Sequence, residues 1–197
     1  NVVASDVAII TGTKIKDLLE SEILRKNAIA ARFNNEIKSL NYEIQENGTI
    51  ELIDISDKDG IRVYRKGLLF IIGKAIEELY PEAKMIVNYQ LSNSLLCELD
   101  NMEITDEMVE KINERVAQIV EQNLSIEKTY MTKEEAESFY KDKTTTKGKL
   151  QLELETREKV SLYWCEDYFN YFYGILPINT GMMNIYEIVK YHRGFLV

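Results

Sequence analysis

The spacing of apolar residues predicts a chain that mixes helices with short strands. Residues 61–80 repeat apolar positions at intervals of three and four, which is the period of an α-helix with one buried face. Pro81 follows this pattern and is expected to end the helix, because proline lacks the backbone N–H that a helix needs. The predicted buried stripe is Leu68, Ile72, Ala75, Ile76 and Leu79.

Residues 105–123 carry a second helical pattern. Its first turn contains acidic residues, which stabilise the positive N-terminal end of a helix dipole. A third helix is expected to open at Thr132, since Glu135 stands three positions later and completes a capping box. The predicted buried stripe of the second helix is Met108, Ile112, Val116, Ile119 and Val120.

Short β-branched runs dominate the first 60 residues. A strand-like run at 7–10 precedes a helical pattern at 12–24, and turn residues such as Asn34 and Asn35 separate the runs that follow. A small sheet that embraces one helix would bury these faces. The polar segment 56–60 reads as a turn and as the boundary between two domains.

Strands are also expected after the long helix. Residues 84–100 predict a hairpin that turns at Ser92 and Asn93. Residues 149–155 alternate leucine with polar residues, and residues 159–164 form another β-rich run, so both are interpreted as strands.

Composition bounds the function. The 197 residues are 45% apolar and 29% charged, with no apolar run long enough to span a membrane, and no membrane partner is expected. Cys97 and Cys165 lie in apolar stretches without a nearby partner cysteine, so both are interpreted as reduced, buried thiols of a cytoplasmic protein.

The net charge of −9 disfavours extensive nucleic-acid binding, because phosphate contacts need clustered lysine and arginine. One local exception is the segment 141–149, interpreted as a polar loop. A solvated loop is its simpler interpretation, and weak RNA binding is the alternative. The candidate RNA-binding residues are Lys141, Lys143, Lys147 and Lys149.

Three further groups of residues favour structural roles. His192 has no nucleophile motif beside it and is interpreted as a surface or interdomain residue. The segment from Tyr163 to Ile178 is rich in aromatic residues and contains no lysine or arginine. This composition favours packing of the rings over base stacking. Asp57 and Asp59 are interpreted as turn residues, since nothing apolar nearby would raise a carboxyl pKa.

Several separated motifs, in order, resemble the N-terminal half of threonyl-tRNA synthetases. The segments GTKIKDLL, NAIAARFNNEIKSLNYEI and GTIELID resemble a TGS domain, a β-grasp module. GKAIEELYPEAKM, ITDEMVEKINERVAQIVEQN and FYGILPINTG resemble the editing domain that follows it. The resemblance implies an α+β fold, with a TGS-like β-grasp domain at 1–60 and an editing-domain-like α/β sandwich with an antiparallel sheet at 61–197. By the same analogy, the turn at Asn34 and Asn35 is a candidate nucleotide or RNA contact.

The chemistry of that editing family requires residues that this chain lacks. The family carries H-x-x-x-H on the helix and C-x-x-x-H in the later motif, a set suited to metal binding or water activation. The resemblance places Lys66 and Phe70 at the histidine positions, and Phe172 and Leu176 at the cysteine and histidine positions. We therefore expect no catalytic or metal site here and no cofactor in this chain, with the former cavity filled by apolar side chains.

The tail also resembles another protein class. CEDYFNYFYGILPINTG and YHRGFLV are similar to the segment ahead of the P-loop kinase in bacterial uridine kinase-like proteins of the phosphoribulokinase class. The chain starts at Asn1 and stops on an apolar tail, which suggests an excised N-terminal portion of a longer protein. The kinase domain would then be the partner in the same polypeptide, and ATP and magnesium would bind only there.

Three functions follow from these expectations. The favoured hypothesis is a non-catalytic regulatory or RNA- or nucleotide-sensing head of a uridine kinase-like enzyme. The alternatives are an aminoacyl-tRNA trans-editing hydrolase related to threonyl-tRNA synthetase, and a protein-interaction module.

Overall fold

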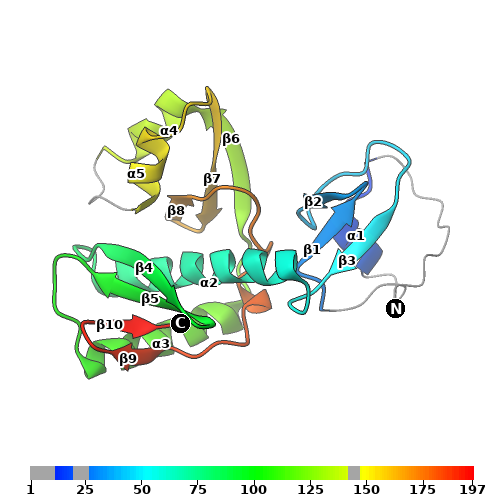
Figure 1. Ribbon diagram of the computed structural model, residues 1–197. Coiled ribbons are helices and arrows are strands. Elements are labelled where there is room, and N and C mark those ends of the chain that lie inside the picture. Colours follow the sequence, from blue (N-terminus) through cyan, green and yellow to red (C-terminus); the bar gives the residue numbers. More distant parts are fainter. Residues whose placement is uncertain (1–11, 20–26, 142–146) are drawn as a thin grey trace. The chain divides into compact units, whose positions relative to one another are not determined.

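The computed structural model describes residues 12–19, 27–141 and 147–197, and it combines helices with antiparallel sheets (Figure 1). This α+β class is the one that the sequence predicted. The helices are α1 Ile15–Leu19, α2 Lys58–Leu79, α3 Asp106–Gln122, α4 Lys133–Phe139, α5 Lys147–Glu153 and the 3-10 turn η1 Thr180–Met182. The strands are β1 Ala30–Phe33, β2 Glu36–Lys38, β3 Ile50–Ile53, β4 Met85–Leu91, β5 Ser94–Leu99, β6 Glu127–Thr132, β7 Lys159–Cys165, β8 Tyr168–Tyr171, β9 Val189–Tyr191 and β10 Gly194–Leu196. No described helix is long and apolar enough to cross a membrane.

The chain divides into two compact units, and the division falls inside α2. The first unit comprises residues 1–67 and 174–178, and the second comprises 68–173 and 179–197. The sequence placed a boundary at residue 60, just before the expected helix. The assignment of 1–60 and 61–197 as separate domains stays a prediction.

The first unit contains a three-stranded antiparallel sheet of order β2-β1-β3. Asn34 and Asn35 both have positive φ, at 48° and 65°, and they form the two-residue turn of the β1–β2 hairpin, as predicted. The side chain of Ile15 in α1 is fully buried. The predicted strand at 7–10 and part of the predicted helix at 12–24 lie outside the described residues.

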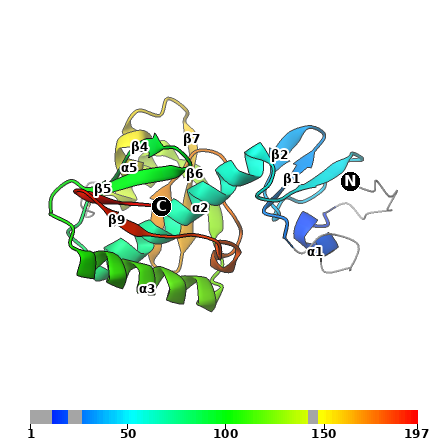
Figure 2. The same cartoon turned by 60° about the horizontal axis from the view of Figure 1, so that its bottom comes forward.

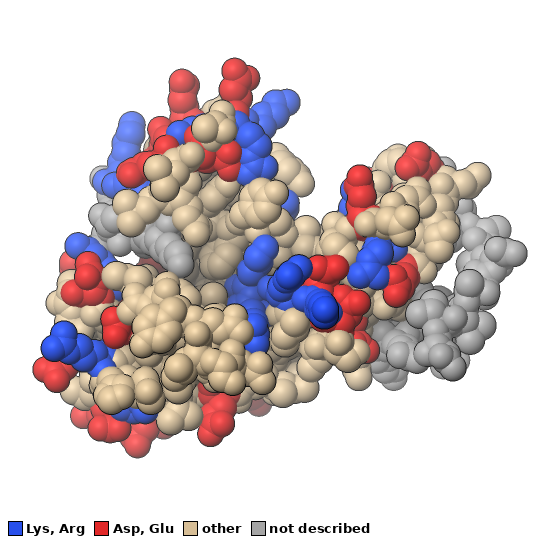
Figure 3. Space-filling view, in the orientation of Figure 1, with Lys and Arg blue, Asp and Glu red and all other residues tan. Residues whose placement is uncertain are grey.

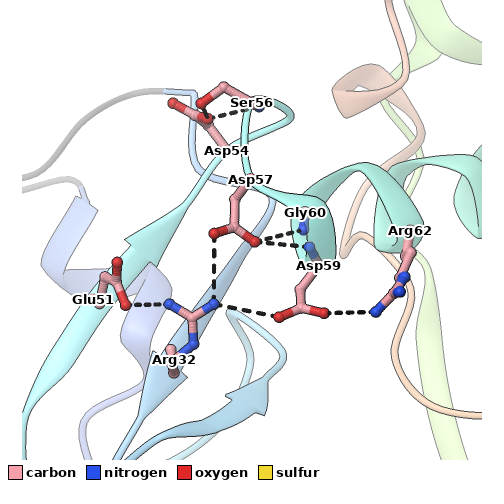
Figure 4. A network of polar contacts seen from close by, with 8 residues as sticks. All are labelled: Arg32, Glu51, Asp54, Ser56, Asp57, Asp59, Gly60 and Arg62. Carbon is pink, nitrogen blue, oxygen red and sulfur yellow. Dashed lines mark hydrogen bonds and ion pairs between the residues drawn. The ribbon is translucent and has the colours of Figure 1, made fainter.

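Arg32 of β1 is the centre of a charged network in the first unit (Figure 4). Its guanidinium binds Glu51 of β3, and it lies 3.5 Å from Asp57 and 3.3 Å from Asp59 at the start of α2. The Asp57 carboxylate also accepts hydrogen bonds from the backbone N–H of Asp59, at 2.7 Å, and of Gly60. Asp57 therefore caps the first turn of α2 and joins that turn to the sheet.

Helix α2 begins at Lys58, earlier than the predicted residue 61, because the segment that reads as a polar turn is its capped first turn. It ends at Leu79, before Pro81, as predicted. Its second half is buried on nearly every side, not along one stripe, and Phe70 and Ile71 have no exposed surface. A helix that is apolar all round is typical of the centre of a core.

A four-stranded antiparallel sheet of order β4-β5-β10-β9 belongs to the second unit. The predicted hairpin at 84–100 is confirmed, with Ser92 at a positive φ of 56°. The apolar tail forms β10, which lies between β5 and β9, and Phe195 is fully buried. Gly194 is required there, because a Cβ atom would come within 2.0 Å of the Cys97 carbonyl oxygen. Helix α3 lies against β9 (Figure 1 and Figure 2).

A three-stranded antiparallel sheet of order β6-β7-β8 completes the second unit. One face packs on α4 and α5, and the other contacts α2. The capping box of Thr132 and Glu135 opens α4, as predicted. The buried cluster between the sheet and the two short helices comprises Ala136, Tyr140, Leu152, Val160, Leu162, Phe169 and Tyr171.

The strand predicted at 149–155 is wrong, since these residues belong mostly to α5. Leu152 alone of the three alternating leucines enters the cluster. Leu150 is 51% exposed and Leu154 is 83% exposed, so the alternation does not mark a buried face. In α3 the buried residues are Val109, Ile112, Val116 and Ile119. The predicted Met108 and Val120 are only half-buried.

Replacing Asp57 with alanine should lower the free energy of unfolding by about 1 kcal/mol at pH 7, because the change removes a helix cap and a partner of Arg32. Backbone hydrogen bonding, led by the N–H of Asp59, lowers the pKa of Asp57. Its stabilising effect is therefore present above the unfolded pKa of about 3.9 and is lost as the pH falls further. Urea titrations at pH 7 and pH 3 measure the difference, with the exposed Glu110→Ala as control. A loss that is equal at both pH values would contradict the assignment.

Candidate functional site

The four positions that the sequence resemblance assigns to the editing residues lie on α2 and on the segment after β8. Lys66 and Phe70 are one helical turn apart on α2. Phe172 directly follows β8, and Leu176 lies between β8 and η1. Phe70 and Leu176 are buried and Phe172 is half-buried, so three of the four side chains are in apolar packing.

Phe70 is the centre of an aromatic cluster in the second unit. Its ring lies 5.0 Å from that of Tyr168 and 6.0 Å from that of Phe172, both in edge-to-face geometry. Such contacts add about 0.5–1.5 kcal/mol each beyond the area that they bury. Gly73, one turn later, allows the sheet to approach, because a Cβ atom there would come within 2.4 Å of the Tyr168 hydroxyl.

Hydrogen bonds hold the Tyr168 hydroxyl, a polar group beside this cluster, in place. The Asn170 amide donates to the Tyr168 hydroxyl at 3.2 Å, and the Tyr140 hydroxyl donates to the Asn170 carbonyl oxygen at 2.9 Å. Burial raises the pKa of Tyr168 well above its ordinary value. The phenol therefore stays neutral at physiological pH and does not act as a base.

Lys74 is a buried charge that sequence reasoning missed. Its ammonium lies 2.9 Å from Glu78 and 3.0 Å from Glu166, and it donates to the Cys165 carbonyl oxygen at 3.4 Å. Burial acts to lower the pKa of Lys74, but the hydrogen bonds to the two glutamates outweigh it and the pKa is raised. The sequence did contain a signal for this ion pair, since Lys74 lies among apolar helix residues and Glu78 follows four positions later.

The Lys74 network extends to α3 through Glu78, which accepts a hydrogen bond from Arg115 at 2.7 Å. Burial opposes the ionisation of Glu78, yet its bonds to Arg115 and Lys74 lower its pKa. Burial raises the pKa of the neighbouring Cys165 thiol to about 11, which makes it a poor nucleophile at pH 7. The network is thus built to hold charge, and it offers no lowered lysine pKa for base catalysis.

Lys66 belongs to the first unit, where its ammonium lies 3.0 Å from the point that a Cβ atom on Gly174 would occupy. It shares one face of α2 with Lys58, Arg62 and Arg65, since these positions are three or four residues apart. Figure 3 shows basic side chains gathered over this half of α2, with acidic ones beside them. Because Arg62 pairs with Asp59 at 3.2 Å, this face is mixed in charge.

The four candidate RNA-binding lysines do not form one loop. Lys141 is exposed, whereas Lys143 lies outside the described residues. Lys147 opens α5 and Lys149 lies within it, half-buried, so the loop interpretation of 147–149 is wrong. Their RNA-binding role stays a prediction.

The other candidate residues have structural surroundings. His192 has a positive φ of 47° and its ring packs edge-to-face on Tyr191 at 4.4 Å. Cys97 and Cys165 are buried and are not in a disulfide. Within residues 12–19, 27–141 and 147–197, no three His, Cys, Asp or Glu side chains are arranged to hold a metal ion.

The chain is similar to threonine–tRNA ligases over nearly all its length. It is 31% identical to the enzyme of Clostridium tetani over 191 residues, which cover 93% of this chain and 30% of that protein. It is 27% identical to the enzyme of Acetivibrio thermocellus over 191 residues, with the same coverage. A third relative, from Clostridium novyi, is 32% identical over 124 residues, 62% of this chain and 20% of that protein. No family model matches the chain.

The chain is therefore similar to one part of the threonine–tRNA ligases, the N-terminal region. That much of the sequence resemblance is confirmed. The chain spans about 30% of the length of the curated relatives that it matches.

Replacing Phe70 with alanine should lower the free energy of unfolding by roughly 3–5 kcal/mol, because it removes a fully buried ring and leaves a cavity. Urea unfolding measures the loss. The control is Leu154→Ala, which truncates a side chain that is 83% exposed and should change stability by less than about 0.5 kcal/mol. If the two variants were equally stable, Phe70 would not be the packing element described here.

Replacing Lys74 with methionine should be tolerated better than replacing it with alanine, because methionine keeps the buried apolar volume. The raised pKa of Lys74 and the lowered pKa of Glu78 imply that the ion pair stabilises the fold between about pH 4 and pH 10. The stability difference between the natural chain and Lys74→Met should therefore shrink below pH 4, as Glu78 is protonated. Thermal unfolding from pH 3 to pH 8 tests this, and a difference independent of pH would exclude a charge effect.

Proposed function

We propose that this chain is a non-catalytic, threonyl-tRNA synthetase-like region that senses RNA or a nucleotide and regulates a larger polypeptide. The observation that carries the proposal is the burial of Phe70 and Leu176 at two positions where the editing family has catalytic or ligand side chains. Neither a phenyl ring nor an isobutyl group moves a proton or binds a metal.

The remaining groups near these positions do not replace the missing chemistry. Lys74 is paired with two carboxylates and has a raised pKa, so it stays protonated. The Cys165 thiol and the Tyr168 phenol both have raised pKa values. Each nearby nucleophile is therefore held in its unreactive form at neutral pH.

The larger polypeptide is proposed to be a uridine kinase-like P-loop phosphotransferase. Support comes from the likeness of CEDYFNYFYGILPINTG and YHRGFLV to the segment that precedes the kinase in that class. ATP and magnesium would bind in the kinase domain, and this region would be its partner in the same cytoplasmic polypeptide.

Hydrolytic editing of mischarged tRNA is the competing proposal, and the similarity to threonine–tRNA ligases favours it over a general interaction module. It requires a general base and a means to activate water. Lys66 is the one polar side chain among the four corresponding positions.

The 197-residue chain should not accelerate hydrolysis of seryl-tRNA. Single-turnover deacylation at pH 7.5 should match the rate in buffer, both for the natural chain and for Lys66→Ala. Hydrolysis in mild alkali shows that the substrate is intact. A rate above buffer that falls in Lys66→Ala would establish editing and overturn the non-catalytic proposal.

A further inference from the structure

One half of a sheet face in the second unit is exposed, and its residues come from two neighbouring strands. In the β6–β7 register, Lys128 is opposite Tyr163, Tyr130 is opposite Ser161, and Thr132 is opposite Lys159. Directly opposed residues of an antiparallel pair project to the same face. We define the open face as Lys128, Tyr130, Thr132, Lys159 and Ser161.

The open face continues a surface that α2 covers. Tyr168 is opposite Cys165 on the same side of the sheet, and it packs against Phe70 and Gly73 of α2. Beyond this contact, α2 no longer covers the sheet face. Tyr130 is 72% exposed, Thr132 and Lys159 are exposed, and Lys128 and Ser161 are half-buried.

The charge of the open face differs from that of the chain as a whole. The chain has a net charge of −9, yet the described β6 and β7 positions on this face carry two lysines and no carboxylate. Strand alternation places Glu127 on the opposite face, where it is paired with Trp164. The surface is therefore locally basic, which suits a polyanion.

An exposed ring lies within this basic surface. The Lys128 ammonium lies 5.0 Å from the centroid of the Tyr130 ring and 5.4 Å from that of Tyr163. This cation–π contact positions a positive charge directly beside an exposed aromatic ring. Single-stranded nucleic acids are bound by this combination, in which a base stacks on the ring and the backbone phosphate meets the cation.

We propose that the open face binds single-stranded RNA, with Tyr130 as the stacking residue and Lys128 and Lys159 as the phosphate contacts. The inference rests on the proposed RNA-sensing function and assigns it a surface. A duplex presents its bases edge-on and stacked, so it should bind less well.

The test is fluorescence anisotropy of a fluorescein-labelled, 12-nucleotide single-stranded RNA of mixed sequence with the 197-residue chain. Tyr130→Ala should weaken binding about tenfold, in keeping with the loss of one stacked base. The matched control Tyr89→Ala removes another exposed tyrosine, on β4, and should bind as the natural chain does. Circular dichroism confirms that the variants are folded.

A charge variant tests the phosphate contacts separately. Lys128→Glu with Lys159→Glu should abolish binding at 150 mM salt. Lys111→Glu with Lys190→Glu changes the net charge equally on other elements and should weaken binding by less than about threefold. Replacing Lys141, Lys143, Lys147 and Lys149 with glutamate tests the competing site.

The outcomes separate the inference from the proposed function. If the natural chain binds RNA but Tyr130→Ala and the Lys128/Lys159 variant bind equally well, the open face is wrong and RNA sensing stands. If neither RNA nor a nucleotide binds the natural chain even at 20 mM salt, RNA or nucleotide sensing falls, and the inference with it. Equal affinity for duplex RNA or for a poly-glutamate peptide would also overturn the inference, because it would show attraction by charge alone.

Discussion

Burial of α2 on nearly all sides is the constraint on which the second unit depends. Gly73 makes this possible, because its missing side chain lets the hydroxyl of Tyr168 in β8 approach the helix. Phe70, one turn earlier, fills the space beside the sheet. The helix thus lies between the two sheets of the unit. Any larger residue at Gly73 would push the Tyr168 side chain away from α2.

The same burial limits which side chains can stand at the positions that the sequence resemblance assigns to editing residues. A histidine at position 70 would bring a polar ring into a fully buried aromatic cluster. The other two positions that the resemblance assigns, 172 and 176, carry phenylalanine and leucine, which neither bind a metal nor accept a proton.

The sequence predicted those features that depend on local chemistry. Pro81 ended α2, Thr132 and Glu135 capped α4, and Asn34 with Asn35 formed a tight turn, since each depends on neighbouring residues alone. The alternating leucines of α5 led to the wrong prediction of a strand at 149–155, because a short helix can carry a two-residue period by chance. Strand pairing was beyond local reasoning as well. The apolar tail is a central strand because it pairs with β5 on one side and with β9 on the other.

The contacts of Lys128 and Lys74 could not be predicted from the sequence, because they depend on residues that are distant along the chain. No lysine or arginine lies between Tyr163 and Ile178 in the sequence, and the cation beside Tyr163 is Lys128, which comes from a different strand. Lys74 was hidden for a related reason, since its second carboxylate, Glu166, comes from the distant β7–β8 turn. In both cases the sheet supplies a partner that lies far away in the sequence.

The proposed RNA-binding surface and the packing against α2 therefore occupy different halves of one sheet face. Where α2 covers the face, apolar contacts and the Lys74 ion pairs hold the fold, and substitution is costly. On the open face, Tyr130 and Lys159 contribute little to the core because they remain largely in water. Under the RNA-binding proposal, the ligand would occupy the exposed half of the face and leave the packing around Phe70 undisturbed.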